Sequence, residues 1–314
     1  MKVHGLLLLD KPKGLSSNTA LQKARRLLDA DKAGHGGTLD PLADGLLPLM
    51  FGEACKLAES ALEGDKAYEA TIRLGQATTT DDAEGEVIAA APVAFADANL
   101  QAVLGRFRGR IVQVPPTYSA LKVAGKALYR YARDGNPLQA APREVQVHAL
   151  ELLDRRGGDQ PALDIRVSCS KGTYIRSLAR DIGAALGCGG HLRALRRTVV
   201  GRFQVGAAVT LDALAAMTPE QRRRQLVDLE ALVADWPSVA LDGAETARFR
   251  QGQVVAVDPQ RLCAGAAETA PAESTATSAA KIAVFCDGRL AGLARCSSDN
   301  QQGFALAPAR VIVP

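Results

Sequence analysis

Residues 34–45 read GHGGTLDPLADG and combine four glycines with a histidine and an Asp-Pro pair. The hydrophobic residues of this stretch follow neither a helical nor an alternating pattern, so we expect a loop. Glycine permits positive φ angles and close approach of a partner to the backbone, and a proline disfavours the α conformation of the residue before it. We therefore expect the loop to hold the carboxylate of Asp40 in a fixed position. The same residue types are also typical of an ordinary turn, and the neighbouring segments decide between the two interpretations.

The overall composition indicates a globular protein with room for one large and one small domain. The chain has 314 residues, of which 47% are hydrophobic, and this length supports a sizeable core. The formal net charge is +4, and residues 239–314 carry equal numbers of basic and acidic side chains, so the excess lies in residues 1–238. This distribution is compatible with a polyanionic partner, although so small an excess does not establish one.

The spacing of the cysteines and the length of the hydrophobic runs indicate whether the protein binds zinc, forms disulfides or spans a membrane. The six cysteines are scattered without a Cys-x-x-Cys pair, which argues against a zinc site and against a disulfide framework. The run Leu6–Leu9 is too short to span a membrane, and no other run approaches the required length. We therefore expect a soluble, cytoplasmic protein.

Hydrophobic periodicity predicts both strands and helices in the first 238 residues. Strands are expected at 5–9, 66–74, 110–114, 145–153 and 163–169. Helices are expected after Ser16 or Ser17, at 97–107, and from about Tyr174 with Thr173 as the N-cap. The polar stretch 78–85 is expected to be a loop or hairpin tip, and residues 211–234 are expected to form short helices.

Two segments of the chain are basic. Residues 117–146 interleave basic side chains with three tyrosines, a combination that suits RNA because cations meet phosphates and rings stack on unpaired bases. An exposed charged helix with its tyrosines in the core is the alternative interpretation. Residues 176–202 hold six arginines against one acid, Asp181, and we expect a second basic surface there. The three arginines at 222–224 are interpreted as a solvated face.

From Val239 the composition changes to a small β-rich unit. Strands are expected at 254–257, 282–285, 289–295 and 304–306, with turns at 287–288 and 302–303. Residues 264–280 lack large apolar side chains and are predicted to form a mobile loop between strands. We therefore predict two domains, residues 1–238 with the basic insert at about 117–146, and residues 239–314 with the low-complexity insert 264–280.

Four separated motifs resemble one known family. They are LLDKPKGLSS at 8–17, GHGGTLDPLADG at 34–45, PPTYSALK at 115–122 and KGTYIR at 171–176. In this order and approximate spacing they resemble the TruB family of tRNA pseudouridine synthases, and the tail from Val239 resembles a small PUA-like domain. The resemblance implies an α+β pseudouridine synthase fold with a mixed, largely antiparallel sheet, followed by a small C-terminal all-β PUA-like domain.

The resemblance assigns catalytic roles to residues of these motifs. Asp40 matches the essential aspartate of the family, and Arg176 matches the arginine that pairs with it. Tyr174 matches a tyrosine that contacts both this acid and the substrate base. Tyr68 matches the ring that stacks on the flipped uracil, and His35 matches a histidine that helps to hold the target base out of its stack.

Further residues receive binding roles from the same resemblance. Leu195 matches a leucine of the uracil pocket, and Asp82 matches an acid near the bound RNA. A leucine or a tyrosine on an apolar strand is otherwise an ordinary core residue. The basic residues expected to bind RNA are Lys122, Lys126, Arg130, Arg133, Arg196 and Arg197.

The reaction that the resemblance implies is the isomerisation of a uridine to pseudouridine at position 55 in the T-loop of tRNA, by base flipping and without metal or cofactor. The implied partner is the T stem-loop, and we expect a monomer without an obligatory protein partner. A same-fold synthase acting on another RNA and a non-catalytic tRNA-binding or folding chaperone are the alternatives. Gly36 and Asp44 stand where bacterial members usually have threonine. The glycines of residues 34–45 are expected to let a flipped nucleotide approach the backbone that carries Asp40.

Overall fold

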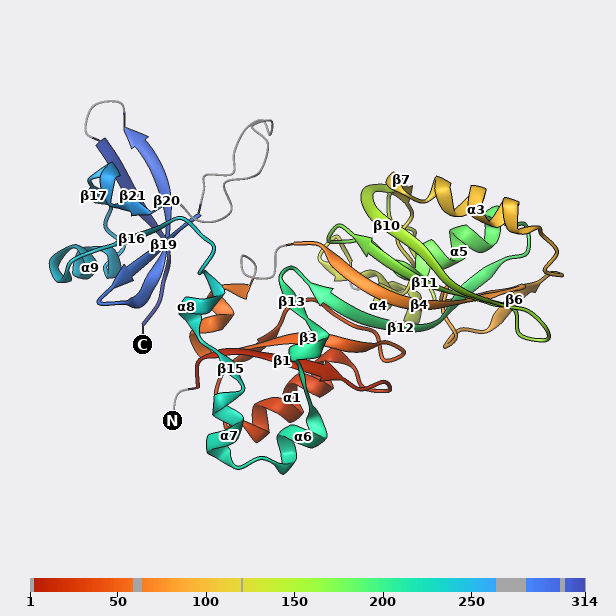
Figure 1. The fold of residues 1–314 in the computed structure, drawn as a ribbon, viewed down its shortest axis with the longest axis horizontal. Coiled ribbons are helices and arrows are strands. Elements are labelled where there is room, and N and C mark those ends of the chain that lie inside the picture. The colour runs from red at the N-terminus through yellow and green to blue at the C-terminus, as the bar shows by residue number, and fades with distance from the viewer. Residues whose placement is uncertain (1–2, 59–63, 120, 264–280, 300–302, 314) are drawn as a thin grey trace.

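A large mixed sheet runs through the first 227 residues of the protein (Figure 1). The computed structural model describes residues 3–58, 64–119, 121–263, 281–299 and 303–313. Among these residues eleven strands form the sheet, in the order β14-β1-β3-β12-β4-β11-β10-β7, with β2, β13 and β15 paired beside this path. Their bounds are β1 Gly5–Lys11, β2 Ala33–His35, β3 Asp44–Phe51, β4 Lys66–Leu74, β7 Gly109–Gln113, β10 Arg143–Arg156, β11 Ala162–Cys169, β12 Gly190–Val200, β13 Phe203–Gln204, β14 Val209–Thr210 and β15 Leu226–Val227.

The sheet is mixed and largely antiparallel, as expected. Parallel pairing joins β1 to β14 and β3 to β12, and the other neighbours are antiparallel. The strand β12 was not predicted, because its three arginines interrupt the apolar pattern that marks a central strand. It nevertheless lies in the middle of the sheet, between β3 and β4.

Four consecutive leucines make β1 a strand that is buried on both faces. Leu7 and Leu9 pack with α1 (Ser17–Leu27) and α6 (Leu211–Ala216). Leu6 and Leu8 face the opposite way, into a cluster that also contains residues of the C-terminal unit. An unbroken apolar run is the pattern of a strand with two covered faces. Because alternate leucines of β1 point to opposite faces of the sheet, this strand belongs both to the cluster under α1 and α6 and to the cluster shared with the C-terminal unit.

Two helices cover the other half of the large sheet. The helices α3 (Asp97–Arg106) and α5 (Ile175–Ala185) pack on β4, β10 and β11 (Figure 1). The predicted apolar face of α5 is buried. The predicted cap is wrong, since Tyr174 occupies the N-cap position without a side-chain hydrogen bond, and the Thr173 hydroxyl donates to the Ser170 carbonyl. That hydroxyl is used in the preceding turn and is not available to the helix.

Short helices connect the sheet to the C-terminal unit. They are α7 (Pro219–Arg224) and α8 (Leu229–Leu232). The interpretation of residues 222–224 as a solvated face is wrong for Arg222. Its guanidinium donates to the carbonyls of Leu27, Leu214 and Ala215, and so ties α7 to the ends of α1 and α6. No helix in the described parts of the chain combines the length and the apolar character needed to cross a membrane.

The C-terminal unit has its own sheet and core. Its strands follow the order β17-β21-β20-β19-β16-β18, with bounds Val255–Val257, Gly303–Val311, Arg289–Asp299, Lys281–Cys286, Ser238–Ala240 and Leu262–Cys263. The turn at Asp287–Gly288 has positive φ angles of 49° and 73°, as a tight two-residue hairpin turn requires. The helix α9 (Gly243–Arg250) was not predicted, and residues 264–280 and the turn residue 302 lie outside the described residues.

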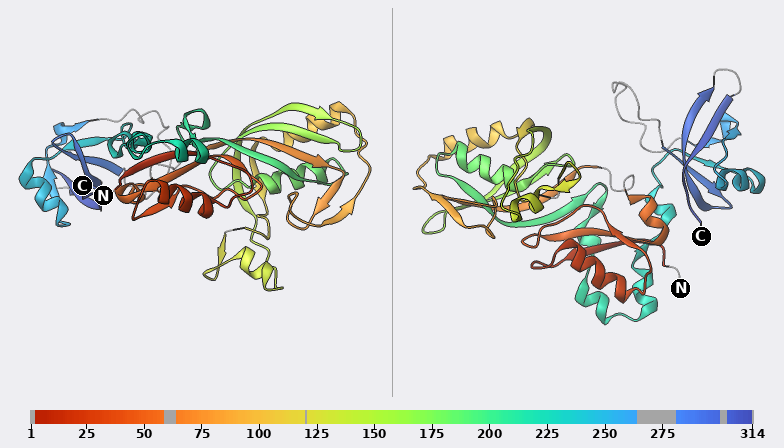
Figure 2. Two further views of the ribbon diagram at one scale, coloured as in Figure 1. Left: turned by 90° about the horizontal axis from the view of Figure 1, so that it is seen from below. Right: turned by 180° about the vertical axis from the view of Figure 1, so that it is seen from behind.

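The basic segment 117–146 forms an arm that leaves the body of the molecule. It contains the short hairpin β8 (Lys122–Val123) and β9 (Lys126–Ala127), followed by α4 (Leu128–Arg133). In the left view of Figure 2 the yellow-green ribbon of this arm projects away from the two sheets. Its tyrosines are half-buried and not in the core, since the rings of Tyr129 and Tyr131 lie against cations of the arm itself.

Candidate active site

Two adjoining cavities meet at Asp40 and Arg176. The first cavity, of about 380 Å³, is also lined by Tyr68, Tyr174 and Leu195. The second cavity, of about 560 Å³, is lined by a different set that includes His35, Asp82, Tyr129 and Arg133. The fold thus brings together every residue to which a catalytic role was assigned, from β2, β4, α5, β12 and the loop before β3.

The predicted RNA-binding residues are distributed differently. Arg133 lines the second cavity, whereas Lys122 and Arg130 are exposed on the arm. Lys126 forms an ion pair with Asp134 within the arm. Arg197 is buried to 1% exposure beneath the first cavity. It therefore does not lie on the exposed basic surface that was expected.

The first motif holds the loop that carries Asp40, a role that the sequence analysis did not find. The buried hydroxyl of Ser17 donates to the carbonyl of Leu39 at 2.9 Å and accepts from its N–H at 2.7 Å. The N–H of Gly14 donates to the carbonyl of Pro41 at 2.7 Å. The residues on both sides of Asp40 are thus fixed by residues 14–17. Ser16, and not Ser17, is the N-cap of α1.

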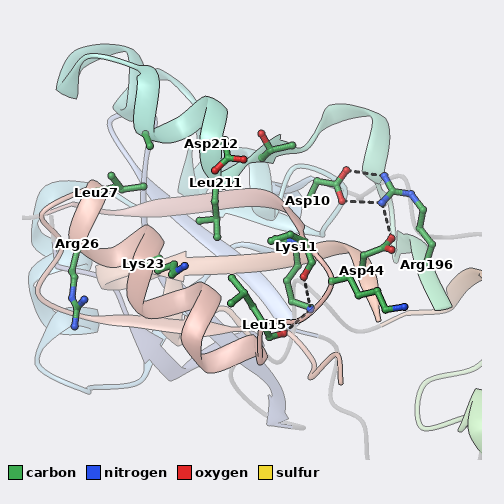
Figure 3. A pocket seen from close by; sticks show the side chains of 14 residues that line it. Asp10, Lys11, Leu15, Lys23, Arg26, Leu27, Asp44, Arg196, Leu211 and Asp212 are labelled. Atoms are coloured by element: carbon green, nitrogen blue, oxygen red, sulfur yellow. Dashed lines mark hydrogen bonds and ion pairs between the residues drawn. The ribbon is translucent and has the colours of Figure 1, made fainter. Parts of the chain in front are cut away.

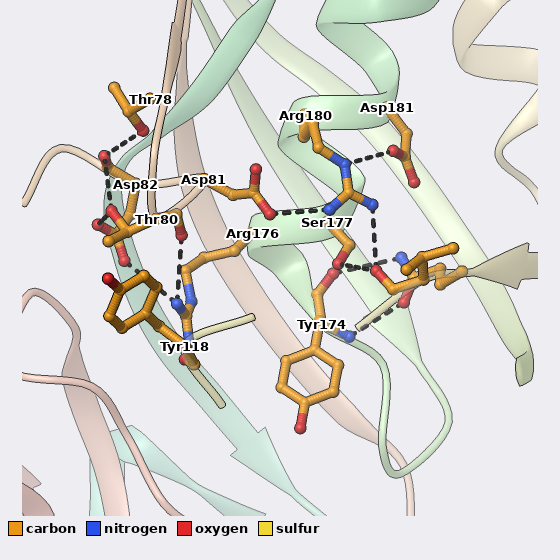
Figure 4. A network of polar contacts seen from close by, with 12 residues as sticks. Thr78, Thr80, Asp81, Asp82, Tyr118, Tyr174, Arg176, Ser177, Arg180 and Asp181 are labelled. Carbon is orange, nitrogen blue, oxygen red and sulfur yellow. Dashed lines mark hydrogen bonds and ion pairs between the residues drawn. The ribbon is translucent and has the colours of Figure 1, made fainter. Parts of the chain in front are cut away.

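Arg176 lies between two carboxylates, those of Asp40 and Asp82, and Figure 4 shows its contacts with Asp82, Thr80 and Tyr118. Its Nη2 is 3.1 Å from Oδ2 of Asp40, and its Nη1 is 3.5 Å from Oδ2 of Asp82. The guanidinium also donates to the carbonyls of Tyr118 and Thr80, at 2.8 and 3.3 Å. Its side chain is 7% exposed, so these four acceptors fix it in one orientation. A cation in the first turn of a helix opposes the helix dipole, and the two acids supply the compensation.

Asp82 is the deeper of the two acids, at 4% side-chain exposure, whereas Asp40 is 40% exposed. The Thr80 hydroxyl donates to Asp82 Oδ1 at 2.5 Å, and the Glu84 N–H donates to the same oxygen at 3.0 Å. These bonds belong to the tip of the hairpin that β5 (Gln76–Thr78) and β6 (Val87–Ala90) form, as predicted for residues 78–85. Asp82 is therefore a fixed anchor for Arg176, and Asp40 is the more exposed of the two acids and the one that lines both cavities.

The protonation of Asp40 depends on opposing influences. Burial raises the pKa of its carboxyl above the ordinary value, and the negative charge of Asp82 acts in the same direction. Arg176 and Lys11 act in the opposite direction, and the net pKa remains raised. The carboxylate is therefore a stronger base than an exposed aspartate.

Tyr174 is held by a residue that the sequence analysis missed. The side-chain amide of Gln113, 1% exposed, accepts from the Tyr174 N–H at 3.1 Å and donates to its carbonyl at 3.2 Å. The guanidinium of Arg143 lies 4.6 Å from the centre of the Tyr174 ring. A polar residue at a buried position of a strand is a signal that could have identified Gln113. The tyrosine is thus fixed through its backbone on one side and its ring on the other.

His35 and Tyr68 line different cavities of the site, His35 the second and Tyr68 the first. The Nδ1 atom of His35 is buried and has no hydrogen-bond partner within the described residues. Burial and the nearby cation of Arg197 lower the pKa of His35, which is therefore neutral at neutral pH. Tyr68 is 7% exposed, and burial raises the pKa of its phenol. Both side chains thus present uncharged surfaces to the cavities.

The arginines of residues 176–202 do not form the second basic surface that was expected. Arg180 pairs with Asp81 and Asp181, and Arg202 pairs with Asp235. Arg196 pairs with two further acids from other strands. Apart from Asp181, their partners come from other segments of the chain, so a count of charges along residues 176–202 overestimated the positive charge of this surface.

The two acids on Arg196 explain one departure from the family pattern. Arg196 Nη2 lies 2.7 Å from Asp10 Oδ2, and its Nη1 lies 2.8 Å from Asp44 Oδ1 (Figure 3). Asp10 belongs to β1, and Asp44 begins β3, directly after the loop of Asp40. The added charge of Asp44 therefore has a partner. These side chains also line a cavity of about 690 Å³ beside α1 and α6.

Replacing Asp44 with threonine is expected to lower the free energy of unfolding by about 0.5–1 kcal/mol, because a half-exposed ion pair contributes about this much. The residues of this pair are 40% and 34% exposed, and Arg196 keeps its contact with Asp10. Urea denaturation of the two proteins measures the difference. A loss of more than about 2 kcal/mol would contradict this estimate and show that Asp44 holds the loop more strongly.

No group of three or more His, Cys, Asp or Glu side chains that could hold a metal ion occurs in the part of the chain that the structure describes.

Comparison with known proteins identifies the family. Residues 25–175 match the TruB family pseudouridylate synthase (N terminal domain), and residues 176–234 match the tRNA pseudouridylate synthase B C-terminal domain. The tRNA pseudouridine synthase B of Aromatoleum aromaticum is 49% identical over 310 residues, which are 99% of this chain and 93% of that protein. The protein of the same name from Burkholderia mallei is 50% identical over 312 residues, covering 99% and 97% of the two chains.

Solved structures agree with this result. The crystal structure of a Cbf5-Nop10-Gar1 complex gives a TM-score of 0.70 at 26% identity and covers 99% of this chain and 85% of that chain. The structure of an H/ACA RNP bound to a substrate RNA containing 2'-deoxyuridine gives a TM-score of 0.69 at 24% identity, covers 99% of this chain and 85% of that chain, and shows the fold alone. The expected pseudouridine synthase fold is confirmed. Together with matches to curated relatives over nearly its whole length, this shows that the chain belongs to the TruB family of pseudouridylate synthases.

Proposed function

We propose that this protein isomerises the uridine at position 55 in the T-loop of tRNA to pseudouridine, with Asp40 as the essential acid. The observation that carries the proposal is the ion pair of Asp40 with Arg176 at the junction of two cavities, one of which contains Tyr68. Curated relatives at about half identity bear the name tRNA pseudouridine synthase B. The reaction breaks the N1–C1′ bond and forms a C5–C1′ bond, so a proton leaves C5 and another is gained at N1.

The first cavity fits the base that has to turn. Its volume of about 380 Å³ accommodates a uracil and its ribose, and Tyr68 and Leu195 supply a ring face and an apolar wall. Asp40 reaches the same space, held by residues 14–17 and by Arg176. The guanidinium orients the carboxylate and favours its ionised form, which the surrounding burial disfavours.

The second cavity and the arm suit the rest of the stem-loop. His35 and Arg133 line this cavity, and the exposed cations Lys122 and Arg130 lie on the projecting arm. A flipped base leaves a gap that a protein side chain has to fill, and neutral His35 is placed beside Asp40 for that purpose. We assign the phosphate contacts to the arm and exclude Arg197 from them. The enzyme acts as a monomer without a protein partner in this proposal.

Tritium release tests the proposed function. A T-arm stem-loop with 5-tritiated uridine at the target position is expected to lose its label to water when the purified protein is added, because the C5 hydrogen leaves during the reaction. A stem-loop with cytidine at the target position, labelled at the other uridines, should retain its label. Release from both RNAs, or from neither, would contradict the proposal.

The pH profile follows from the raised pKa of Asp40. If the ionised carboxylate is required, kcat/KM is expected to fall about tenfold for each pH unit below this pKa, and the fall should begin at higher pH than for an exposed aspartate. Stem-loop assays between about pH 4 and pH 8 measure the profile. If kcat/KM does not fall at any acidic pH at which the protein stays folded, the reaction does not require an ionised Asp40.

A further inference from the structure

Arg197 differs from the other buried or paired arginines of the protein. It is 1% exposed and lies on β12, the central strand. Its Nε donates to the carbonyl of Leu46 at 2.8 Å and its Nη2 donates to the carbonyl of Gly37 at 3.2 Å. Tyr68 lies directly opposite Arg197 on the neighbouring strand β4, and both side chains line the first cavity. No carboxylate forms an ion pair with it among the residues that the structure describes, so neutral acceptors alone face its charge.

This arrangement is unfavourable for stability. A buried charge that is compensated only by neutral acceptors loses its hydration without gaining an ion pair. Burial accordingly lowers the pKa of Arg197. An apolar side chain of similar volume would avoid this cost of burial, and yet the arginine stands under the cavity that contains Asp40. Its presence therefore requires an explanation other than the stability of the fold.

The groups that Arg197 contacts belong to the catalytic machinery. The Gly37 carbonyl lies at the start of the loop that carries Asp40, and the Leu46 carbonyl lies in the strand that follows this loop. Tyr68 is the residue whose ring is expected to stack on the flipped uracil. One rigid guanidinium thus joins both ends of the loop, and it does so beside Tyr68, its neighbour across the strand pair. Lysine cannot do this, because its ammonium group has no planar fork.

The glycines of the loop fit Arg197. A Cβ atom on Gly45 would lie 2.3 Å from the Arg197 carbonyl oxygen and 2.8 Å from its backbone nitrogen. A Cβ on Gly37 would lie 3.5 Å from Arg197 Nη1. Both glycines have positive φ angles, of 96° and 95°. The expectation that these glycines make room for a nucleotide is therefore corrected for Gly45, where the close neighbour is the backbone of β12.

We propose that Arg197 is a positioning residue, which sets the distance between the Asp40 loop and the Tyr68 ring and thereby aligns the carboxylate with the stacked base. The inference rests on the proposed function and adds to it. Arg197 acts through Gly37, Leu46 and Tyr68 and does not contact the RNA backbone. Misplacement of reacting groups by about 1 Å costs about 100-fold in rate, which sets the size of the expected effect.

Three single variants test the proposal with the stem-loop assay. Arg197→Met is expected to lower kcat about 100-fold and to change KM by less than about threefold, because alignment is lost and RNA binding is not. Arg197→Lys keeps the charge and loses the fork, and its kcat is expected to fall about tenfold. Arg193→Met is the matched control, since Arg193 lies exposed on the same strand and donates only to Gln160. Its kcat should stay unchanged.

Thermal unfolding separates positioning from folding. The Tm of Arg197→Met is expected to equal or exceed that of the unaltered protein, because the cost of burying the charge is removed. A role in folding alone predicts the opposite, a lower Tm with kcat unchanged per folded molecule. If Arg197→Met does not fold, Arg197→Lys decides by the same criteria. A kcat within threefold of the unaltered protein in the folded variants would overturn the inference.

A double-mutant cycle tests the link to the ring. Tyr68→Phe keeps the ring and removes the hydroxyl of the residue that lies opposite Arg197 across the strand pair. The loss in the double variant Arg197→Lys/Tyr68→Phe is expected to be smaller than the product of the single losses, because both changes affect the same neighbouring pair. If the loss of kcat in the double variant equals the product of the two single losses, Arg197 and Tyr68 act independently, and the inference is overturned. Absence of tritium release by the unaltered protein would overturn the proposed function as well, whereas normal release by the Arg197 variants overturns this inference alone.

Discussion

Asp40→Asn is expected to lower tritium release by more than about 1,000-fold while the affinity for the T-arm stem-loop stays within about threefold. The amide is nearly isosteric and keeps a contact with Arg176, so the cavity should keep its shape. It has neither the charge nor the basicity of the carboxylate. Tritium release under saturating enzyme measures the loss, and filter binding measures the affinity.

The Tm of Asp40→Asn is a useful control. A carboxyl whose pKa is raised by folding makes the protein more stable below that pKa, and this stability is lost as the pH rises through it. At neutral pH the neutral amide should therefore leave the Tm unchanged or raise it. Full activity in this variant would refute the assignment of Asp40. A protein that binds tRNA equally well and never released tritium would instead be the chaperone of the alternative interpretation.

Arg176→Ala is expected to reduce kcat about 100-fold or more and to weaken RNA binding much less. Without the guanidinium, Asp40 and the buried Asp82 face each other with no cation between them, so the pKa of Asp40 rises further and less of it is ionised. The steady-state parameters of the stem-loop assay separate kcat from KM. The acid limb of the pH profile should move to higher pH, which a purely structural defect would not cause.

Arg180→Ala is the matched control for this variant. Arg180 lies one turn further along α5, forms ion pairs with Asp81 and Asp181, and does not line either cavity. Removing one partner of a buried ion pair destabilises both variants, by about 3–5 kcal/mol where burial is complete. The activities of Arg176→Ala and Arg180→Ala are therefore compared per folded molecule. Equal losses of catalysis and binding in Arg176→Ala would identify Arg176 as a phosphate contact.

Several elements could be predicted because their signals are local. The run Leu6–Leu9, the alternation of residues 66–74 and the apolar face of residues 175–186 each contain their own periodicity. The turn at Asp287–Gly288 is specified by residue types that tolerate positive φ. The four motifs indicated the family in the same way, since each is a short run of fixed residues. These features depend on neighbours in the chain and required no knowledge of the fold.

The strand β12 and its arginines could not be predicted from local pattern. Arg196 pairs with Asp10, which is 186 residues away, and Arg180 pairs with Asp81, which is 99 residues away. In the sequence these arginines form a basic cluster with one acid, and in the structure they pair with acids of other segments, which are β1, β3 and the tip of the β5–β6 hairpin. Charge pairing depends on distance in space, which a one-dimensional count does not contain.

The sequence by itself determined the family, the reaction and the residues Asp40, Arg176, Tyr68 and Tyr174 as its candidates, because motifs and hydrophobic periods are properties of adjacent residues. Only the tertiary structure decided how Asp40 is held: by Ser17 and Gly14 from the first motif, by Arg176 against Asp82, and by Arg197 beneath the loop. These contacts join segments that are distant in the chain. Their geometry follows from the packing of the whole sheet, and no local pattern encodes it.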